Sequence, residues 1–172
     1  MLLRSIYENF GACCEDYMDG IQHLKNRSMN KAAHSFDSAY RSVDPGSKYR
    51  NKYASYTGLS RVLSGDKTGI ELCREAAENE QHDGDVYLNL ARAEWFLANR
   101  QNTIAVLKKG LKCDSEHRGL KQMRQQLGVR ERTAVPFLPR GHQLNRALGE
   151  LMREDHQPDA EAMLQFRFFT PY

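Results

Sequence analysis

The sequence has no long apolar run, and this absence excludes a membrane-spanning helix. Its longest uncharged stretches are far shorter than the ~20 apolar residues that such a helix needs. Near the start of the chain, Glu8, Asn9 and Glu15 interrupt the apolar region that a secretory signal peptide requires. We therefore expect a cytoplasmic protein without a membrane span.

Cysteine is scarce and is not arranged as a metal-binding or redox motif. Cys13 and Cys14 are adjacent, while Cys73 and Cys113 stand alone, so the sequence contains no Cys-x-x-Cys motif. Cys113 and His117 are four residues apart and can share a helix face, but two ligands do not complete a zinc site. The sequence predicts neither a metal site nor a cofactor.

Catalytic motifs are also missing. The chain contains no Gly-x-Ser-x-Gly nucleophile elbow, no phosphate-binding glycine loop and no His-Glu-x-x-His zinc motif. Its six histidines are scattered, and no segment has a convincing β-strand pattern. We therefore predict an all-α protein that is not an enzyme.

Charged residues are plentiful but unevenly distributed. Residues 1–117 carry 16 basic and 16 acidic side chains, residues 118–153 carry 8 and 2, and residues 154–172 carry 1 and 4. The chain thus divides into a neutral body, a basic segment and an acidic tail. The tail is also rich in apolar residues, which are Met163, Leu164, Phe166, Phe168 and Phe169.

The neutral body has an internal repeat. Tyr17, Tyr53 and Tyr87 are spaced by 36 and 34 residues, and each begins a helical apolar pattern that is followed by a second one. Each second pattern has a small residue, a large residue four positions later and a small residue three positions after that. The triplets are Ala32, Phe36 and Ala39, then Gly69, Cys73 and Ala76, then Thr103, Leu107 and Gly110. Small residues at these positions let neighbouring helices approach closely.

This pattern resembles the tetratricopeptide repeat, a 34-residue helix-turn-helix unit. The resemblance covers residues 13–117 as three degenerate units, 13–45, 50–82 and 84–117. It implies a right-handed superhelix of six α-helices, in which the first helix of each unit lines a concave groove. The alternative is a helical bundle with chance periodicity, but a bundle does not require small residues at the same place in each second helix.

The basic segment 118–153 is predicted to cap the superhelix. Leu120, Met123 and Leu127 lie near one face of a helix, and Gly128 is placed to end that helix. A solenoid end needs such a helix because it otherwise exposes an apolar face.

The rest of the chain is predicted to be less regular. Val135–Pro139 contains two prolines and is expected to be extended, whereas residues 144–151 have the pattern of a further amphipathic helix. The tail, residues 154–172, has three open interpretations. It is a loosely ordered end, a segment docked on the protein's own groove, or a linear motif for a partner.

The resemblance implies a function in protein–protein interaction. If the three tyrosines mark the buried face, the residues one, five, eight and nine positions later face the groove. These are Met18, Gln22, Lys25 and Asn26, then Ala54, Gly58, Arg61 and Val62, then Leu88, Arg92, Trp95 and Phe96. A tryptophan, a phenylalanine and three cations suit an extended peptide with apolar and acidic anchors. The alternative for Trp95 is that its side chain packs in the core and does not face the groove.

Some members of the family hold a partner's C-terminal carboxylate with Lys and Asn at fixed positions of the first helices. The matching positions here are Met18, Gln22, Ser55, Asp85 and Asn89. Only Asn89 keeps the residue type, and Asp85 has the wrong charge for a carboxylate ligand. The resemblance therefore argues against this class of partner, although Asn89 stays among the candidate groove residues.

Two other functions stay open at this point. Small three-unit members of the family serve as secretion chaperones, but the basic balance and the C-terminal segment fit that group poorly. The second alternative is binding of nucleic acid or another polyanion by residues 118–153. That segment has no recognition motif and its only aromatic residue is Phe137, so we favour a solvated capping face. The sequence specifies neither the partner nor the oligomeric state.

Overall fold

The computed structural model describes residues 14–128 and residue 143. Over these residues the regular secondary structure is entirely helical, which confirms the prediction of an all-α fold. The helices are α2 (Glu15–Lys25), α3 (Met29–Ser42), α4 (Arg50–Leu63), α5 (Gly69–Glu78), α6 (Gly84–Phe96), α7 (Arg100–Cys113) and α8 (Arg118–Gln126). In this described part of the chain, no helix has the length and apolar character that a bilayer crossing requires.

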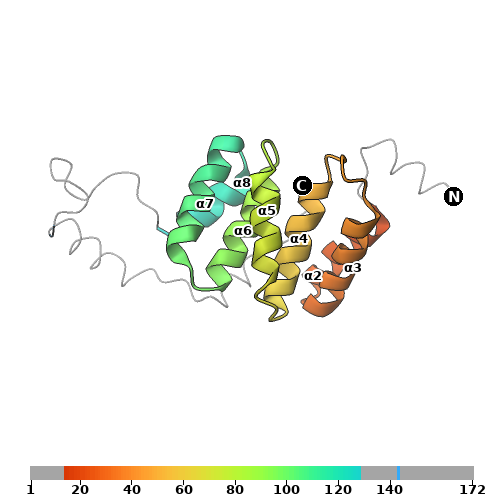
Figure 1. Cartoon of the computed structure of the whole chain (residues 1–172). Coiled ribbons are helices and arrows are strands. Elements are labelled where there is room, and N and C mark those ends of the chain that lie inside the picture. The colour runs from red at the N-terminus through yellow and green to blue at the C-terminus, as the bar shows by residue number, and fades with distance from the viewer. Residues whose placement is uncertain (1–13, 129–142, 144–172) are drawn as a thin grey trace.

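The helices stand side by side in Figure 1, from α2 and α3 at one end to α7 and α8 at the other. Consecutive helices pack in pairs, α2 with α3, α4 with α5, and α6 with α7, and α8 packs against both α6 and α7. The pairs are joined because α4 also contacts α3 and α6. As a result, every residue of α4 from Tyr53 to Ser60 is buried.

The first helix of each pair ends in the same backbone turn. A residue with positive φ follows each of these helices, and these residues are Arg27 (φ 55°), Gly65 (φ 101°) and Ala98 (φ 62°). After α2, the Ser28 amide donates a hydrogen bond to the His23 carbonyl at 2.8 Å, and the equivalent bonds after α4 and α6 are both 2.9 Å. This combination is the Schellman motif, which satisfies carbonyl groups at the end of a helix.

Small residues lie where the paired helices cross most closely. Gly58 of α4 faces Gly69 of α5, and a Cβ on either residue would lie 2.5 Å from the carbonyl oxygen of the other. A Cβ on Gly110 of α7 would lie 2.7 Å from a side-chain carbon of α6. Ala32 and Ala76, which we predicted at close contacts together with Gly110, are also buried. The predicted close contact is confirmed for Gly110.

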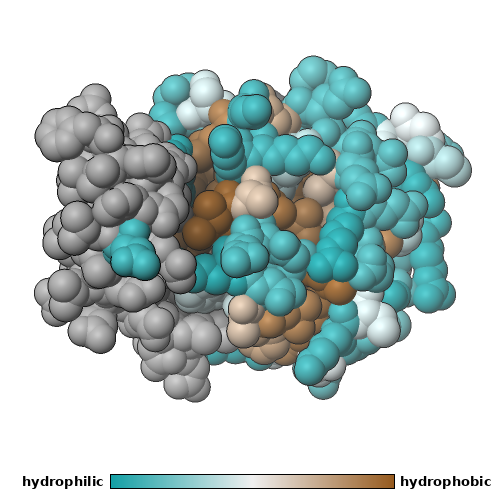
Figure 2. Space-filling view, turned by 60° about the vertical axis from the view of Figure 1, so that its left-hand side comes forward, coloured by the Kyte–Doolittle hydropathy of each residue, from teal (hydrophilic) through white to brown (hydrophobic). Residues whose placement is uncertain are grey.

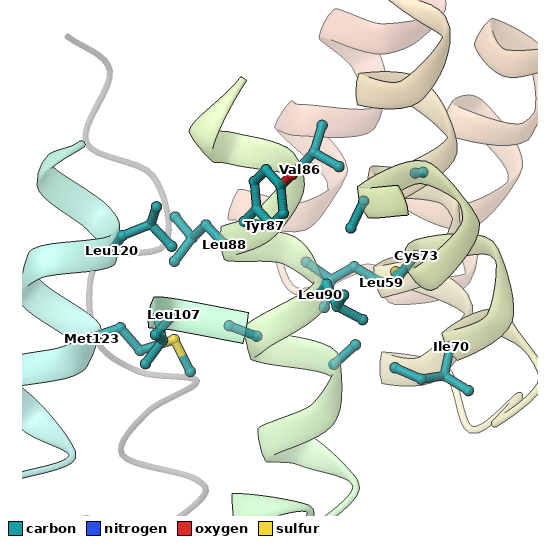
Figure 3. Close-up of a cluster of buried hydrophobic side chains, with 14 of the residues drawn as sticks. Leu59, Ile70, Cys73, Val86, Tyr87, Leu88, Leu90, Leu107, Leu120 and Met123 are labelled. Carbon is teal, nitrogen blue, oxygen red and sulfur yellow. The ribbon is translucent and has the colours of Figure 1, made fainter. Parts of the chain in front are cut away.

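The core consists of two adjoining apolar clusters. The cluster between α2, α3 and α4 is aromatic, with 5.0 Å between the ring centroids of Tyr17 and Tyr53. The larger cluster extends from α4 to α8, and Figure 3 shows part of it. Tyr40 and Leu63 pack against both clusters, so the two form one continuous interior.

The helix predicted over Leu120, Met123 and Leu127 is present as α8, and all three side chains are buried. In Figure 3, Leu120 points toward Leu88 of α6. Gly128 follows the helix with a φ of 59°, a backbone conformation that glycine adopts without strain. Gly128 therefore follows the end of α8, as predicted.

Three other predictions lie outside the described residues. They are the extended segment Val135–Pro139, the helix over residues 144–151 and the interpretations of the tail at 154–172.

Candidate functional site

One stripe of residues runs along the side of α6 that meets α4. Asp85, Asn89, Arg92 and Phe96 are three or four residues apart, so they follow one another along one side of the helix. Asp85 and Asn89 contact α4, whereas Phe96 at the other end is 39% exposed. The stripe thus passes from a buried polar contact to an exposed aromatic ring. We call this stripe, together with the facing residues Lys52, Ser55 and Tyr56 of α4, the first-helix face.

Lys52 connects α4 to α6 through two carboxylates. Its Nζ lies 2.8 Å from an Asp85 oxygen and 3.2 Å from an Asp83 oxygen. Burial alone would lower the pKa of Lys52, but the two carboxylates outweigh this effect and hold the pKa above its ordinary value. Lys52 therefore stays charged and is engaged within the protein.

His117 extends the same contact to α8. It precedes the helix, and its Nδ1 accepts a hydrogen bond from the Leu120 amide at 3.2 Å, while its Nε2 lies 3.1 Å from an Asp85 oxygen. Because Nδ1 is an acceptor, Nε2–H is the donor to the carboxylate. Burial would raise the pKa of Asp85, but His117 and Lys52 hold that pKa well below its ordinary value. One carboxylate thus ties α4, α6 and α8 together.

Tyr56 of α4 lies in the aromatic cluster, where its ring meets Tyr17 of α2 and Phe36 of α3. Burial raises the pKa of the Tyr56 hydroxyl and the Asp85 carboxylate raises it further, whereas the Arg92 guanidinium and a hydrogen bond with Tyr17 lower it. The ring centroids of Tyr17 and Tyr56 are 5.3 Å apart, in an edge-to-face arrangement. Charges on α6 therefore act on this tyrosine of α4.

Two buried polar atoms of α6 have no hydrogen-bond partner. Asn89 donates from Nδ2 to Ser55 Oγ at 3.0 Å, and Ser55 Oγ in turn donates to the Lys52 carbonyl at 2.8 Å. The Oδ1 of Asn89 and the Nε1 of Trp95 are both left unpaired. A buried polar atom without a partner costs about 1–3 kcal/mol.

The exposed members of the predicted groove lie on α2 and α6. Met18 is 46% exposed and Phe96 is 39% exposed, and Gln22 and Lys25 follow Met18 along α2 as exposed residues. Trp95 is partly buried and packs against the larger core cluster, so its side chain serves the core as well as the surface. Figure 2, in which the α7–α8 end is turned forward, shows hydrophobic surface bordered by hydrophilic side chains.

The structure corrects the predicted position of the groove residues of α4. The residues in question are Ala54, Gly58, Arg61 and Val62. They form the side of α4 that faces α5, where a Cβ on Gly58 would lie 2.5 Å from the Gly69 carbonyl oxygen. The Arg61 guanidinium pairs with Asp37 of α3. The prediction that Arg61 converges with Arg92 is therefore wrong, because Arg61 points to the other side of α4.

Leu88 and Asn89 also lack the exposure that we predicted. Leu88 is 5% exposed because α8 covers it, and a Cβ on Gly119 would lie 2.6 Å from its Cδ2. Asn89 is fully buried against Ser55 of α4. Both are interior residues, since neighbouring helices occupy the space where an open groove was expected.

Four residues of the first-helix face were absent from the predicted groove, and they are Lys52, Ser55, Tyr56 and Asp85. The tyrosine spacing gave the wrong register for α4, because Tyr53 stacks on Tyr17 of α2 in the aromatic cluster. The glycines of the first helices, Gly20 and Gly58, indicate the correct register of α4 relative to α2. Gly58 touches α5, and a Cβ on Gly20 would lie 2.5 Å from a ring carbon of α3, so each contacts the second helix of its own pair. Aligning these glycines would have placed Lys52 and Tyr56 on the face.

The thiols of Cys73 and Cys113 both form hydrogen bonds within the protein. Cys73 is buried and donates a hydrogen bond to a backbone carbonyl at 3.3 Å, and burial holds its pKa well above its ordinary value. Cys113 donates to a backbone carbonyl at 2.8 Å, while His117 binds Asp85, so these two residues do not act as a pair. Within residues 14–128 and residue 143, no group of three or more His, Cys, Asp or Glu side chains could hold a metal ion.

A separate cleft of about 360 Å³ lies between the α3–α4 connection and α5. Arg50 lines it, with its guanidinium 4.7 Å from the centroid of the Tyr40 ring and 3.2 Å from the Tyr40 hydroxyl. Asn51, another lining residue, donates to the Asn79 carbonyl at 3.1 Å. These polar groups are satisfied within the protein, so the cleft is a weaker candidate than the first-helix face.

Comparisons of the chain with protein-family models, with curated proteins and with solved structures gave no match. The interpretation of the first-helix face therefore rests on its own geometry.

Proposed function

We propose that the chain is a tetratricopeptide-like right-handed superhelix that binds another protein and is not an enzyme. Three helix pairs in which the first helix ends in the same Schellman turn support a repeated unit. The small residues at the helix crossings support it as well. In such an array the first helices α2, α4 and α6 line one side, and their shared surface is the binding surface.

One observation carries this proposal, and it is the location of the exposed apolar side chains. Among the described residues, the large apolar side chains that are exposed are Met18 and Phe96, and both lie on first helices. Arg92 precedes Phe96 on the same stripe of α6. An aromatic side chain beside an arginine is typical of the residues that dominate the energy of protein interfaces.

The charges of the face define the partner's chemistry. Lys52 contributes little to an incoming ligand because Asp83 and Asp85 already neutralise it. The exposed Lys25 of α2 and the partly buried Arg92 of α6 add positive charge to the first helices, and positive charge favours acidic groups on a partner. The preferred ligand is therefore an extended segment with an aromatic or aliphatic anchor and a nearby Asp or Glu.

The alternatives have less support. On α8, Lys121 is paired with Glu116 at 2.9 Å, and Leu120 and Met123 face the core, as a capping helix requires. The other cations of the basic segment, from Arg130 to Arg153, lie outside the described residues. The secretion-chaperone alternative shares the proposed surface, and no contact in the structure favours it over other protein partners.

The test is selection of extended peptides from a displayed library with the full chain as bait. We expect enrichment of peptides that combine an aromatic residue with Asp or Glu. A variant carrying Arg92→Ala and Phe96→Ser should bind the selected peptides about 30-fold more weakly, as expected for two hot-spot residues.

The control carries Lys108→Ala and Lys112→Ala, which change exposed residues of the second helix α7. This variant should bind the peptides like the unmodified chain, and circular dichroism should show equal helicity for all three proteins. If the Arg92 and Phe96 variant keeps full affinity, the proposed binding surface is wrong.

A further inference from the structure

The tail of the chain has the chemistry that the first-helix face favours. Residues 154–172 carry 4 acidic residues and 1 basic residue, and Asp159 and Glu161 directly precede the apolar group that ends at Phe169. Acidic groups beside aromatic side chains are the features that Arg92 and Phe96 were argued to bind. The tail and the face are therefore complementary in charge as well as in apolar character.

The connection between the tail and the helices is long enough for contact within one chain. Residues 129–153 separate α8 and its terminal glycine from the tail, and these 25 residues span up to roughly 70 Å even with residues 144–151 helical, as the sequence predicts. α8 packs on α6, α6 packs on α4, and the stacked rings of Tyr17 and Tyr53 join α2 to α4. Adjacent packed helices have axes roughly 8–10 Å apart, so these four helices lie within roughly 30 Å of one another. The tail can therefore reach any part of the first-helix face.

The tether also gives the tail an advantage over a free partner. Because the tail belongs to the same chain, its effective concentration at the face is set by the length of the connection and not by the protein concentration. A partner segment of equal intrinsic affinity has to exceed that concentration before it displaces the tail. Occupation by the chain's own tail is thus favoured over occupation by a second copy in dilute solution.

We propose that residues 157–172 dock in cis on the first-helix face and compete there with the partner. The aromatic residues of the tail cover Phe96 and the edge of Trp95, and Asp159 or Glu161 faces Arg92. This inference rests on the proposed function, because it places the tail on the same surface. Its consequence is that the partner meets a face that is already occupied, so binding requires displacement of the tail.

The sequence provides a built-in reporter, because Trp95 is its only tryptophan. The full-length variant carries Phe166→Ser, Phe168→Ser and Phe169→Ser, and Phe137→Ser is the control outside the tail. We expect the triple variant to show stronger acrylamide quenching of Trp95 and emission at longer wavelength. Backbone amides of α4 and α6 should also exchange faster than in the unmodified chain, while the control changes neither signal.

Two further measurements separate the possible outcomes. A synthetic peptide of residues 157–172, added to the triple variant, should restore the quenching of the unmodified chain. The mass in solution should be that of a monomer, with quenching independent of protein concentration. Quenching that changes with concentration together with dimer formation would identify a second copy as the occupant and overturn docking in cis. Unchanged quenching and exchange in the triple variant would overturn docking altogether.

Peptide binding then distinguishes failure of this inference from failure of the proposed function. With cis docking, the triple variant binds the library-selected peptides roughly 10-fold or more tightly than the unmodified chain, because no tail has to be displaced. Equal affinities, with binding still lost in the Arg92 and Phe96 variant, would refute the docked tail and leave the binding surface in place.

Discussion

Replacement of Gly58 by alanine tests the closest helix crossing in the structure. The new Cβ would lie 2.5 Å from the Gly69 carbonyl oxygen, 2.6 Å from Cys73 Sγ and 3.0 Å from the Cys73 amide nitrogen. Two of these three atoms belong to the backbone of α5, so no side-chain rotation relieves the overlap. α4 and α5 would have to separate by roughly 1 Å to restore ordinary contacts.

The size of the effect follows from two opposing contributions. Overpacking of a close interface costs about 1–3 kcal/mol, and the upper part of that range applies because the obstacle is backbone. Alanine is better than glycine in a helix interior by about 1 kcal/mol, which offsets part of the loss. We therefore expect Gly58→Ala to lower the free energy of unfolding by about 2 kcal/mol and the melting temperature by roughly 4–8 °C.

The assay is thermal and urea unfolding followed by circular dichroism, with Gly46→Ala as the matched control. Gly46 lies between α3 and α4, where a Cβ would meet nothing within 4 Å, so the control should be as stable as the unmodified chain or slightly more stable. Gly69→Ala should lower the free energy of unfolding as Gly58→Ala does. The double variant should lose less stability than the sum of the two single variants, because the first change already separates the helices. Equal stability of Gly58→Ala and Gly46→Ala would refute the close crossing.

Two further predictions concern a helix end and the partly buried ionic contact of Asp85. Ala98 has a φ of 62°, which is strained for a residue with a Cβ, so Ala98→Gly should raise the free energy of unfolding by about 0.5–1 kcal/mol in urea titrations. A loss of stability would contradict the Schellman turn after α6. The pKa of Asp85 is held below its ordinary value of 3.8, so its stabilising effect is complete at neutral pH and is lost as the pH falls below 3.8. The stability advantage of the unmodified chain over Asp85→Asn should therefore shrink in acid, and a constant difference from neutral pH to pH 2 would contradict the contact.

The second helices were predictable from the sequence because their small and large residues alternate with exposed polar ones. Ala32 and Phe36 of α3, for example, are fully buried within a helix whose other side is exposed. This one-sided pattern fixes both the helix and its orientation. The capping helix α8 was predictable for the same reason, since Leu120 and Met123 are its buried residues.

The orientation of α4 was not predictable from tyrosine spacing or from polarity. Ser55, Thr57 and Ser60 look like residues of a solvent-facing side, yet all three are buried. Thr57 satisfies its hydroxyl by donating to the Tyr53 carbonyl of its own helix at 2.9 Å, so burial costs it little. Without a polar side to mark solvent, the register of α4 is fixed by its contacts with α3, α5 and α6, and the error at Arg61 followed from this.

The burial of Leu88 was not predictable either, because it depends on where α8 lies rather than on the pattern of α6. The sequence thus predicted only part of the candidate binding surface. Arg92 and Phe96 followed from the helical spacing of α6, whereas Lys52 and Tyr56 became visible only through the packing of α4 against its neighbours.

The position of α4 between both apolar clusters has a consequence for how this chain could change in evolution. Repeat arrays commonly lengthen or shorten by whole units, because each unit contacts only its neighbours through similar surfaces. Here the middle unit contributes a helix that is buried almost all round, and Tyr40 and Leu63 join the interiors on its two sides. Removal of this unit would bring together an aromatic surface and an aliphatic one that are not shaped for each other. The chain is therefore expected to unfold in a single cooperative step, and growth by duplication is tolerated at its ends rather than in its middle.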